Sequence, residues 1–537
     1  MVNFRPVFAS VCFLVAGIFI SYYRMVEGKM LWWLLVIAIL SPWLFFLAVK
    51  NKTRFFVYLL VFYLSFFFGS SSFSLSVGNY RDCAYYNGEY YVSGTIVEKN
   101  VLSTGGELVL TDLTVDGNAA KGRLAVKLYE EDFEALKFCD EVCMRLSLST
   151  RTTMVGAYGF RAEAIANKNL FSGSDVVWYE VTGRAFRPGA YIRGEIQSAL
   201  YRGMGEESAS VATAILLGNT SGIEEGLLEN IRYGGIAHIF AVSGLHIGAV
   251  FAFFVMLFRG NRIPAPIRFV FTAAGLLLYG GVCGYSASVV RAIVTCLVLY
   301  ACTLLGIKYD SLESLSLAAY IVFGVYPTLL FGVGAQLSFC ACLGILLMAR
   351  PTREVAEAAC FGLTDFVKYR IFKRQRPRPK DMFREDTGPP SLAHQAISKV
   401  ISFLSVSLAA QVGTAPILYL SFGYFSVVSL LLNCVFVPLM TLCFSPLLLL
   451  TLLATLLPAI AGIILYVPNV VIGTLMLPFH VLDFSKGILS SLILRGSAVV
   501  CYYCAVLFVS DKINVSPLQR FGTALLFGIT FVICLLV

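Results

Sequence analysis

Two of the four histidines, His238 and His246, lie in one of the most apolar stretches of the chain, IAHIFAVSGLHIGAVF, residues 236–251. Ser243 and Gly244 lie between them, although glycine is unfavourable inside a helix. Polar groups at membrane depth must be hydrogen-bonded, so these side chains are expected to face a bundle interior or a wet cavity. If the helix is continuous, His246 lies about 12 Å deeper than His238. The pattern predicts either a conduit lining or a structural histidine that is hydrogen-bonded to another helix.

Ser243 and His246 could also form a catalytic dyad. At a spacing of three residues they share one helix face, which would allow a serine nucleophile and an imidazole base to meet. No carboxylate nearby in the sequence could orient the imidazole, as a triad requires. An intramembrane hydrolase is therefore the alternative hypothesis.

Two further clusters could line the same conduit. In GYSASVVRA, residues 284–292, Ser288 and Arg291 begin a span. Arg291 either snorkels to the membrane surface or contacts phosphate, whose geometry suits the planar fork of a guanidinium. Gln336 and Ser338, in GVGAQLSFCACLG, could act there or as ordinary hydrogen-bonding links between helices.

The composition indicates which kind of secondary structure must position these residues. The chain has 537 residues, of which 58% are hydrophobic and 14% are charged, whereas about a quarter of the residues of soluble proteins are charged. Its recurrent apolar runs predict a polytopic α-helical membrane protein with about 11 spans, the first an uncleaved helix near residues 7–22. The positive-inside rule places the basic loop at residues 350–395 in the cytoplasm, where it could also contact DNA or lipid.

Residues 77–183 follow a different pattern. Alternating apolar residues in ELVLTDLTV, RLAVKLYE and EVCMRLSLS, separated by turn residues, predict a small exported β-barrel or sandwich. This segment holds ten Lys and Arg against fifteen Asp and Glu, which is unfavourable for strong DNA affinity. In an exported domain Cys83 could form a disulfide with Cys139 or Cys143. The chain contains no HxH or HExxH motif, and we predict no metal site and no cofactor.

The chain accordingly divides into four parts. They are a three-helix membrane segment at residues 1–76, the exported β-domain at residues 77–183, interfacial or connector helices at residues 184–234, and a membrane channel domain at residues 235–537. The arginines within residues 184–205 predict an amphipathic helix at the outer membrane surface, or a plain connector with solvated arginines. No internal repeat is apparent, which disfavours an inverted-repeat transporter.

In order along the chain, these motifs resemble the ComEC family of natural-competence proteins. The resemblance is carried by AILLGNTSGI, GGIAHIFAVSGLHIGAVF, LYGGVCGYSASVVRAIV, GAQLSFCACLGIL and LLNCVFVPLM. It implies an exported OB-like domain and a channel that passes single-stranded DNA across the inner (cytoplasmic) membrane. It also implies roles in the DNA pathway for the polar residues of the clusters: His238, Ser243, Gly244, His246, Ser288, Arg291, Gln336 and Ser338. For two late residues, Asn433 and Pro438, it implies structural roles.

The resemblance further implies a DNA-delivery protein on the outer side and a cytosolic helicase-like ATPase as partners. Many family members carry a metallo-β-lactamase-like domain with an HxHxDH motif, which this sequence does not contain. We therefore expect the form without that domain, acting as a channel rather than as an enzyme. Asn219 stands where the family tends to have an acidic residue, which weakens any charge-dependent role at this position. A small-solute transporter remains a further alternative.

Overall fold

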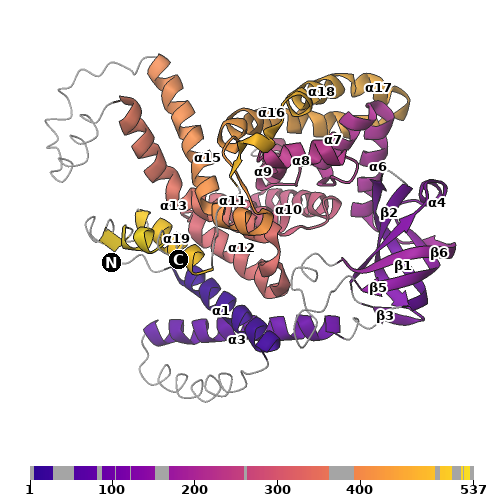
Figure 1. Cartoon of the computed structure of the whole chain (residues 1–537), viewed down its shortest axis with the longest axis horizontal. Helices are drawn as coiled ribbons and strands as arrows, with labels where there is room; N and C mark the ends of the chain where they lie inside the picture. The colour runs from indigo at the N-terminus through magenta and orange to yellow at the C-terminus, as the bar shows by residue number, and fades with distance from the viewer. Residues whose placement is uncertain are drawn as a thin grey trace.

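The computed structural model describes residues 5–27, 54–81, 88–102, 105–120, 122–150, 169–258, 263–361, 392–489, 496–510, 522–523 and 525–531. A strand-rich part lies at one side of a larger helical part, and helix α6 lies next to the strands (Figure 1). The described segments nearest the two ends of the chain, α1 and α19, both lie on the side away from the strands.

The strand-rich part is a sheet that closes on itself. Its elements are β1 (Gly88–Leu102), β2 (Gly105–Val115), β3 (Asn118–Ala120), β4 (Arg123–Leu128), α4 (Glu130–Ala135), β5 (Asp140–Thr150) and β6 (Asn169–Arg184). The order is β1-β5-β6-β4-β2-β3, and β1 also pairs with β2, which closes a ring of five strands. Only β4 and β6 run parallel. Alternating apolar residues such as Val92, Leu108, Leu124 and Met144 fill the interior because successive side chains of a strand point to opposite faces.

The boundaries of this domain differ from the expected residues 77–183. Helix α3 (Arg54–Arg81) continues past residue 77, and β6 ends at Arg184. Cys83, which was predicted to form a disulfide with Cys139 or Cys143, lies outside the described residues. Cys139 and Cys143 are both free thiols, and the Cys139 Sγ donates to the Arg187 carbonyl at 3.5 Å.

The helical part is built from helices of very different lengths. Its elements are α1 (Pro6–Glu27), α3, α6 (Pro188–Gly203), α7 (Glu206–Leu217), α8 (Glu225–Tyr233), η1 (Ala237–Ile239), α9 (Gly244–Leu257), α10 (Ala265–Val282), α11 (Ala287–Leu305), α12 (Ser311–Val325), η2 (Pro327–Phe331), α13 (Val333–Phe361), α15 (Leu392–Phe422), β7 (Phe425–Ser426), α16 (Ser429–Leu456), η4 (Pro458–Ile460), α17 (Ala461–Ile464), α18 (Tyr466–Val481), η5 (Phe484–Gly487), β8 (Ile488–Leu489) and α19 (Gly496–Val509).

Within the described residues, seven helices are long and apolar enough to cross a membrane, or eight if the bent pair Pro458–Ile464 and Tyr466–Val481 forms one span. The chain is therefore a polytopic helical protein, although about 11 spans were expected. The apolar part of α1, Pro6–Tyr22, and the helix Ser311–Val325 are shorter than these seven. Residues 28–53, which belong to the expected three-helix segment at residues 1–76, lie outside the described residues.

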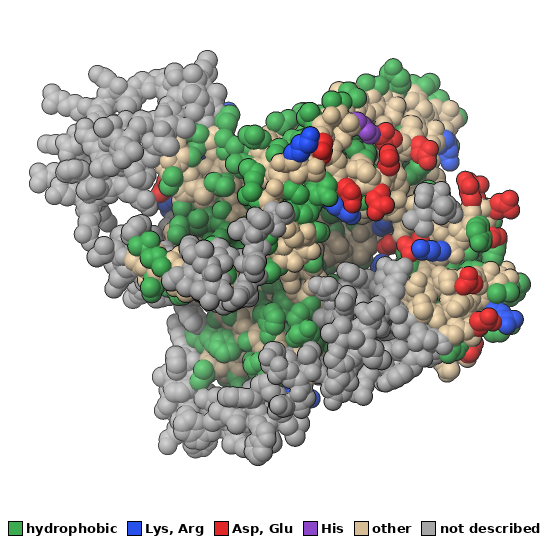
Figure 2. Space-filling model, in the orientation of Figure 1, with side chains coloured by type: hydrophobic (Ala, Val, Ile, Leu, Met, Phe, Trp, Pro, Cys, Tyr) green, Lys and Arg blue, Asp and Glu red, His purple; other side chains and the backbone are tan. Residues whose placement is uncertain are grey.

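The surfaces of the two parts differ in the way that a membrane environment requires. Large apolar side chains are exposed on the helices, including Met256, Val270 and Leu442. Charged side chains gather over the strand-rich part, while hydrophobic ones spread over the helices (Figure 2). Outward-facing apolar residues without a protein partner are suited to contact with lipid tails.

The connector at residues 184–234 is partly buried. Arg184 and Arg202 are exposed, as the sequence suggested, whereas other parts of the connector lie in the helical core. Helix α7 is buried along most of its length, and α6 packs against α10 and α16. Arg193 on α6 is only 6% exposed, although its arginines were expected at the membrane surface or in solvent. The core that covers α6 and α7 is assembled from α9, α10, α11, α16 and α18, which come much later in the sequence.

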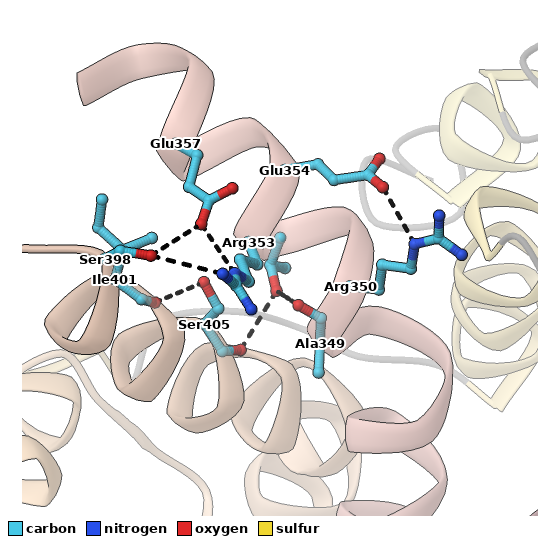
Figure 3. A network of polar contacts seen from close by, with 9 residues as sticks. Ala349, Arg350, Arg353, Glu354, Glu357, Ser398, Ile401 and Ser405 are labelled. Atoms are coloured by element: carbon cyan, nitrogen blue, oxygen red, sulfur yellow. Dashed lines mark hydrogen bonds and ion pairs between the residues drawn. The ribbon is translucent and has the colours of Figure 1, made fainter. Parts of the chain in front are cut away.

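The expected basic loop at residues 350–395 is helical at both of its ends. Helix α13 continues to Phe361, and α15 begins at Leu392. Arg353 Nε donates to Glu357 Oε1 at 2.8 Å. The Ser398 hydroxyl of α15 accepts from Arg353 and donates to Glu357, so the three side chains point toward one another between the two helices (Figure 3). Residues 362–391, which hold most of the basic run, lie outside the described residues.

Candidate functional site

Ser243 and Gly244 begin a helix rather than interrupt one. Residues 240–243 are not helical, and α9 starts at Gly244 with Ser243 as its N-cap. The Ser243 Oγ accepts from the Leu245 N–H at 3.3 Å, and the His246 Nδ1 accepts from the Ser243 N–H at 3.2 Å. This reciprocal arrangement is a capping box in which histidine takes the place of the usual Glu or Gln. The continuous helix that the expected depth difference between His238 and His246 assumed is therefore absent at residues 240–243.

His246 is held firmly within the helical part. Its side chain is 2% exposed, and its ring stacks on Phe444 of α16 with a centroid distance of 4.5 Å. His238, in the preceding turn η1, is exposed. The two histidines lie close enough to interact electrostatically, and His246 is fixed by both a hydrogen bond and an aromatic contact.

Arg291 is a buried cation in the middle of the same region. It lies on α11, is 8% exposed, and contacts the Cys342 Sγ of α13 through Nη1. A Cβ at Gly244 would lie 2.7 Å from Arg291 Nη2, so the guanidinium lies against the start of α9. The three elements α9, α11 and α13 thus meet at one side chain that belongs to the second predicted cluster.

The Arg291 charge has no acidic partner among the described residues. No carboxylate oxygen lies within 4.0 Å of its guanidinium, and its Nε has no hydrogen-bond partner there. A buried charge without a partner is costly, so it is retained where something else supplies the missing contacts. A guanidinium with free donors in a buried place is suited to bind a phosphate group bidentately.

The third cluster is on the face of α13 that carries Cys342. Ser338 lies four residues before Cys342, which places both on one side of the helix, and its buried Oγ has no partner among the described residues. Gln336 Nε2 instead donates to the Leu330 carbonyl at 2.9 Å and holds the turn η2. Ser288 is half-buried in the first turn of α11, one turn before Arg291.

The structure therefore brings part of the predicted set together. Ser243, Gly244, His246 and Arg291 adjoin one another, and Cys342, which the sequence reasoning missed, joins them. Only the apolar Cys-rich run CACLG could have signalled Cys342, and free cysteine in such a run is ordinarily a small hydrophobe.

The remaining predicted residues lie elsewhere. Asn219 lies where the helical part meets the strands, since its Nδ2 donates to Asn100 Oδ1 of β1 at 3.1 Å. Asn433 is buried on α16 with its Oδ1 unpartnered among the described residues, and Pro438 lies one turn further along the same helix.

Serine hydrolase chemistry does not fit the observed contacts. The Ser243 Oγ is engaged with the Leu245 N–H, and the His246 Nδ1 with the Ser243 backbone, so no hydrogen bond joins the hydroxyl to the imidazole. A nucleophile activated by a base needs that bond. The alternative of a Ser243–His246 dyad is therefore not supported.

No metal centre is formed by the described residues. Among them, no three His, Cys, Asp or Glu side chains are grouped so that they could hold an ion. The sequence does contain one CxxC, Cys501 and Cys504, but it lies in the apolar helix α19. A zinc site would need two further ligands near this pair.

A large cavity lies between the two parts of the molecule. Its volume is about 1210 Å³, and it is lined by strands of the barrel on one side and by α6 and the ends of α10, α11 and α12 on the other. None of the eight predicted pathway residues lines it. Val290, which precedes Arg291 in the sequence, does line it, so the cavity reaches α11 next to the Arg291 region.

Comparison with known proteins gives one family and one relative. The family model described as "Competence protein" matches residues 215–511, which is more than half of the chain. The chain is also 27% identical over 243 residues to ComE operon protein 3 of Bacillus subtilis (strain 168). That alignment covers 45% of this chain and 26% of the Bacillus protein, so the chain matches about a quarter of its relative. No solved structure matches.

Proposed function

The chain belongs to the Competence protein family, and on that premise we propose that it is a membrane channel component that passes single-stranded DNA across the inner membrane during natural transformation. The observation that carries this proposal is Arg291, a buried guanidinium without a carboxylate partner where three membrane helices meet. A phosphodiester strand would supply the negative charge that the surrounding residues do not provide.

The proposed route begins at the strand-rich domain, to which we assign an OB-like fold. Three features support this assignment: the closed ring of five strands, the parallel pair β4 and β6, and the helix α4 between β4 and β5. OB folds commonly bind single strands. The strand would then pass the cavity and reach Arg291, Ser288 and the start of α9, and continue along the Ser338 face of α13.

Two partners complete the proposal. The excess of acidic residues in the β-domain favours docking of a DNA-delivery protein over strong DNA affinity of the domain surface as a whole. The basic segment between α13 and α15 is the proposed docking site for a cytosolic helicase-like ATPase, which would supply the energy for transport. The same segment sets the orientation of the chain in the membrane, because the positive-inside rule places this segment in the cytoplasm and the barrel outside.

The test is the arrival of fluorescent DNA in the cytosol. Wild type, a deletion strain, His246→Ala and Arg291→Ala would be compared at matched expression levels. We expect the deletion strain to hold DNA outside the inner membrane and both variants to approach that block. Arg145→Ala is the charge-matched control, because Arg145 is exposed and pairs with Glu89 of the barrel, away from this region and from the basic segment. Normal import by the deletion strain would refute the channel function.

A further inference from the structure

The cavity between the barrel and the helices contains charges of both signs. Two ion pairs cross its lining: Arg123 Nη1 lies 3.0 Å from Glu98 Oε1, and Arg187 pairs with Asp112. These four side chains neutralise one another in pairs. The lining residues that carry charge outside such pairs, among those described, are Arg193 and Glu141.

Arg193 is the buried one of the two. It lies on α6 and is 6% exposed, and its Nη1 donates to the Val282 carbonyl at 3.2 Å. Its Nε has no partner among the described residues, and no carboxylate oxygen lies within 4.0 Å of its guanidinium. One hydrogen bond to a neutral carbonyl does not satisfy five N–H donors and a full charge, so the site is incomplete without an anion.

The surroundings of Arg193 leave room for such a group. Gly284 has a φ of +80°, and a Cβ there would lie 3.8 Å from Arg193 Nη1 and 3.7 Å from Glu98 Oε1, so glycine keeps open a space that borders both the guanidinium and the carboxylate that is paired with Arg123. The hydroxyl of Thr111, on the barrel side of the cavity, is buried without a partner among the described residues. Guanidinium and hydroxyl donors are the groups that proteins use to contact phosphate oxygens.

We infer that Arg193 forms a phosphate-binding site in this cavity, which holds the backbone of a single-stranded nucleic acid before the strand reaches Arg291. The inference rests on the proposed function and deepens it by naming a second contact. Thr95, Thr111 and Thr182 of the barrel strands offer hydroxyl groups on one side of the cavity, while apolar residues such as Leu277 and Leu278 of α10 line the other side.

Binding can be measured without transport. The full chain would be reconstituted in nanodiscs of phosphatidylcholine, and the affinity for fluorescein-labelled (dT)12 followed by anisotropy over a range of salt concentrations. Loss of one charge-assisted phosphate contact in Arg193→Gln is expected to weaken binding about tenfold. It should also reduce the slope of log K against log salt by about 0.7, the value for one phosphate of a single strand.

Three comparisons make the result specific. Arg145→Gln removes the same charge from an exposed pair with Glu89 outside the cavity and should leave affinity and slope unchanged. Arg193→Lys should restore part of the slope, because it restores the charge without the fork. An abasic strand of 12 nucleotides should bind at the same site, because Arg193 would contact the phosphate backbone and not the bases.

Several outcomes would overturn the site. They are wild-type affinity in Arg193→Gln, an equal loss in Arg145→Gln, and a loss of affinity without a change in slope. If Arg193→Gln does not fold, p-benzoylphenylalanine at the exposed position Thr182 provides a second test. Thr182 lines the cavity, so failure to cross-link (dT)12 there would equally refute the site. Neither result depends on whether Arg291 supports import.

Discussion

Arg291 shows how a charge is accommodated at membrane depth. Its guanidinium lies against Gly244 at the first residue of α9 and touches the Cys342 Sγ on α13. Glycine is required at this contact for its lack of a side chain rather than for an unusual φ. The capping box formed by Ser243 and His246 fixes where α9 begins and therefore where the guanidinium can lie.

Replacement of Gly244 tests this arrangement directly. In Gly244→Ala the new Cβ would lie 2.7 Å from Arg291 Nη2, so the guanidinium must move, and we expect DNA import to fall while the protein remains folded. Gly248→Ala is the matched control, because nothing lies within 4 Å of a Cβ at Gly248 on the same helix. Equal import by the two variants would show that the position of the guanidinium is unimportant.

At the scale of elements, α13 and α15 approach each other at two glycines. A Cβ at Gly344 would lie 2.5 Å from the Ala409 carbonyl and 2.7 Å from the Gly413 Cα. Small residues allow membrane helices to come this close, and the contact is then stabilised by van der Waals packing of the backbones. The Tyr502 and Tyr503 hydroxyls of α19 donate to the Val412 and Gly413 carbonyls at 2.7 and 2.9 Å.

We expect Gly344→Ala to lower the unfolding midpoint of the purified protein in detergent. The added methyl meets backbone atoms that cannot turn away, and overpacking of this kind costs about 1–3 kcal/mol. Gly334→Ala, in the first turn of α13 with open space around its Cβ, should leave the midpoint unchanged or slightly raised. A similar midpoint for both variants would contradict the close crossing of α13 and α15.

At the scale of the molecule, function depends on how the barrel sits on the helices. Asn219 donates from Nδ2 to Asn100 Oδ1 and to the Lys99 carbonyl, while its Oδ1 accepts from Ser221. The ion pair of Arg187 and Asp112 provides a second link. The Asn219 contacts join residues 119 and 120 positions apart, and Arg187 and Asp112 line the cavity that also holds Arg193.

Asn219→Asp is expected to loosen this junction. A carboxylate cannot donate to Asn100 Oδ1 or to the Lys99 carbonyl, and it would place a negative charge against both acceptors. Faster hydrogen–deuterium exchange in β1 near Asn100 would report the change. Asn469→Asp is the control, because Asn469 uses its Oδ1 to accept from the Gly205 N–H and a carboxylate keeps that bond. Unchanged exchange in Asn219→Asp would show that the junction is held by other contacts.

The sequence by itself determined the features that depend on local pattern. Apolar runs predicted a polytopic helical protein, period-two alternation predicted the strands between α3 and α6, and the ordered motifs predicted the family. The same motifs singled out Ser243, Gly244, His246 and Arg291, which the structure brings together. Such features are readable because a periodic pattern records which face of each element must be apolar.

Tertiary structure decided the rest, since it depends on partners distant in the sequence. The arginines of residues 184–205 look alike in sequence, yet only the fold buries Arg193 under helices that follow it and leaves it without a carboxylate. The helix start at Ser243 is by contrast a local feature, because Ser243 and His246 form its capping box three residues apart. The energy of a charge is set by the groups within a few ångströms of it, and only the folded chain brings those groups near.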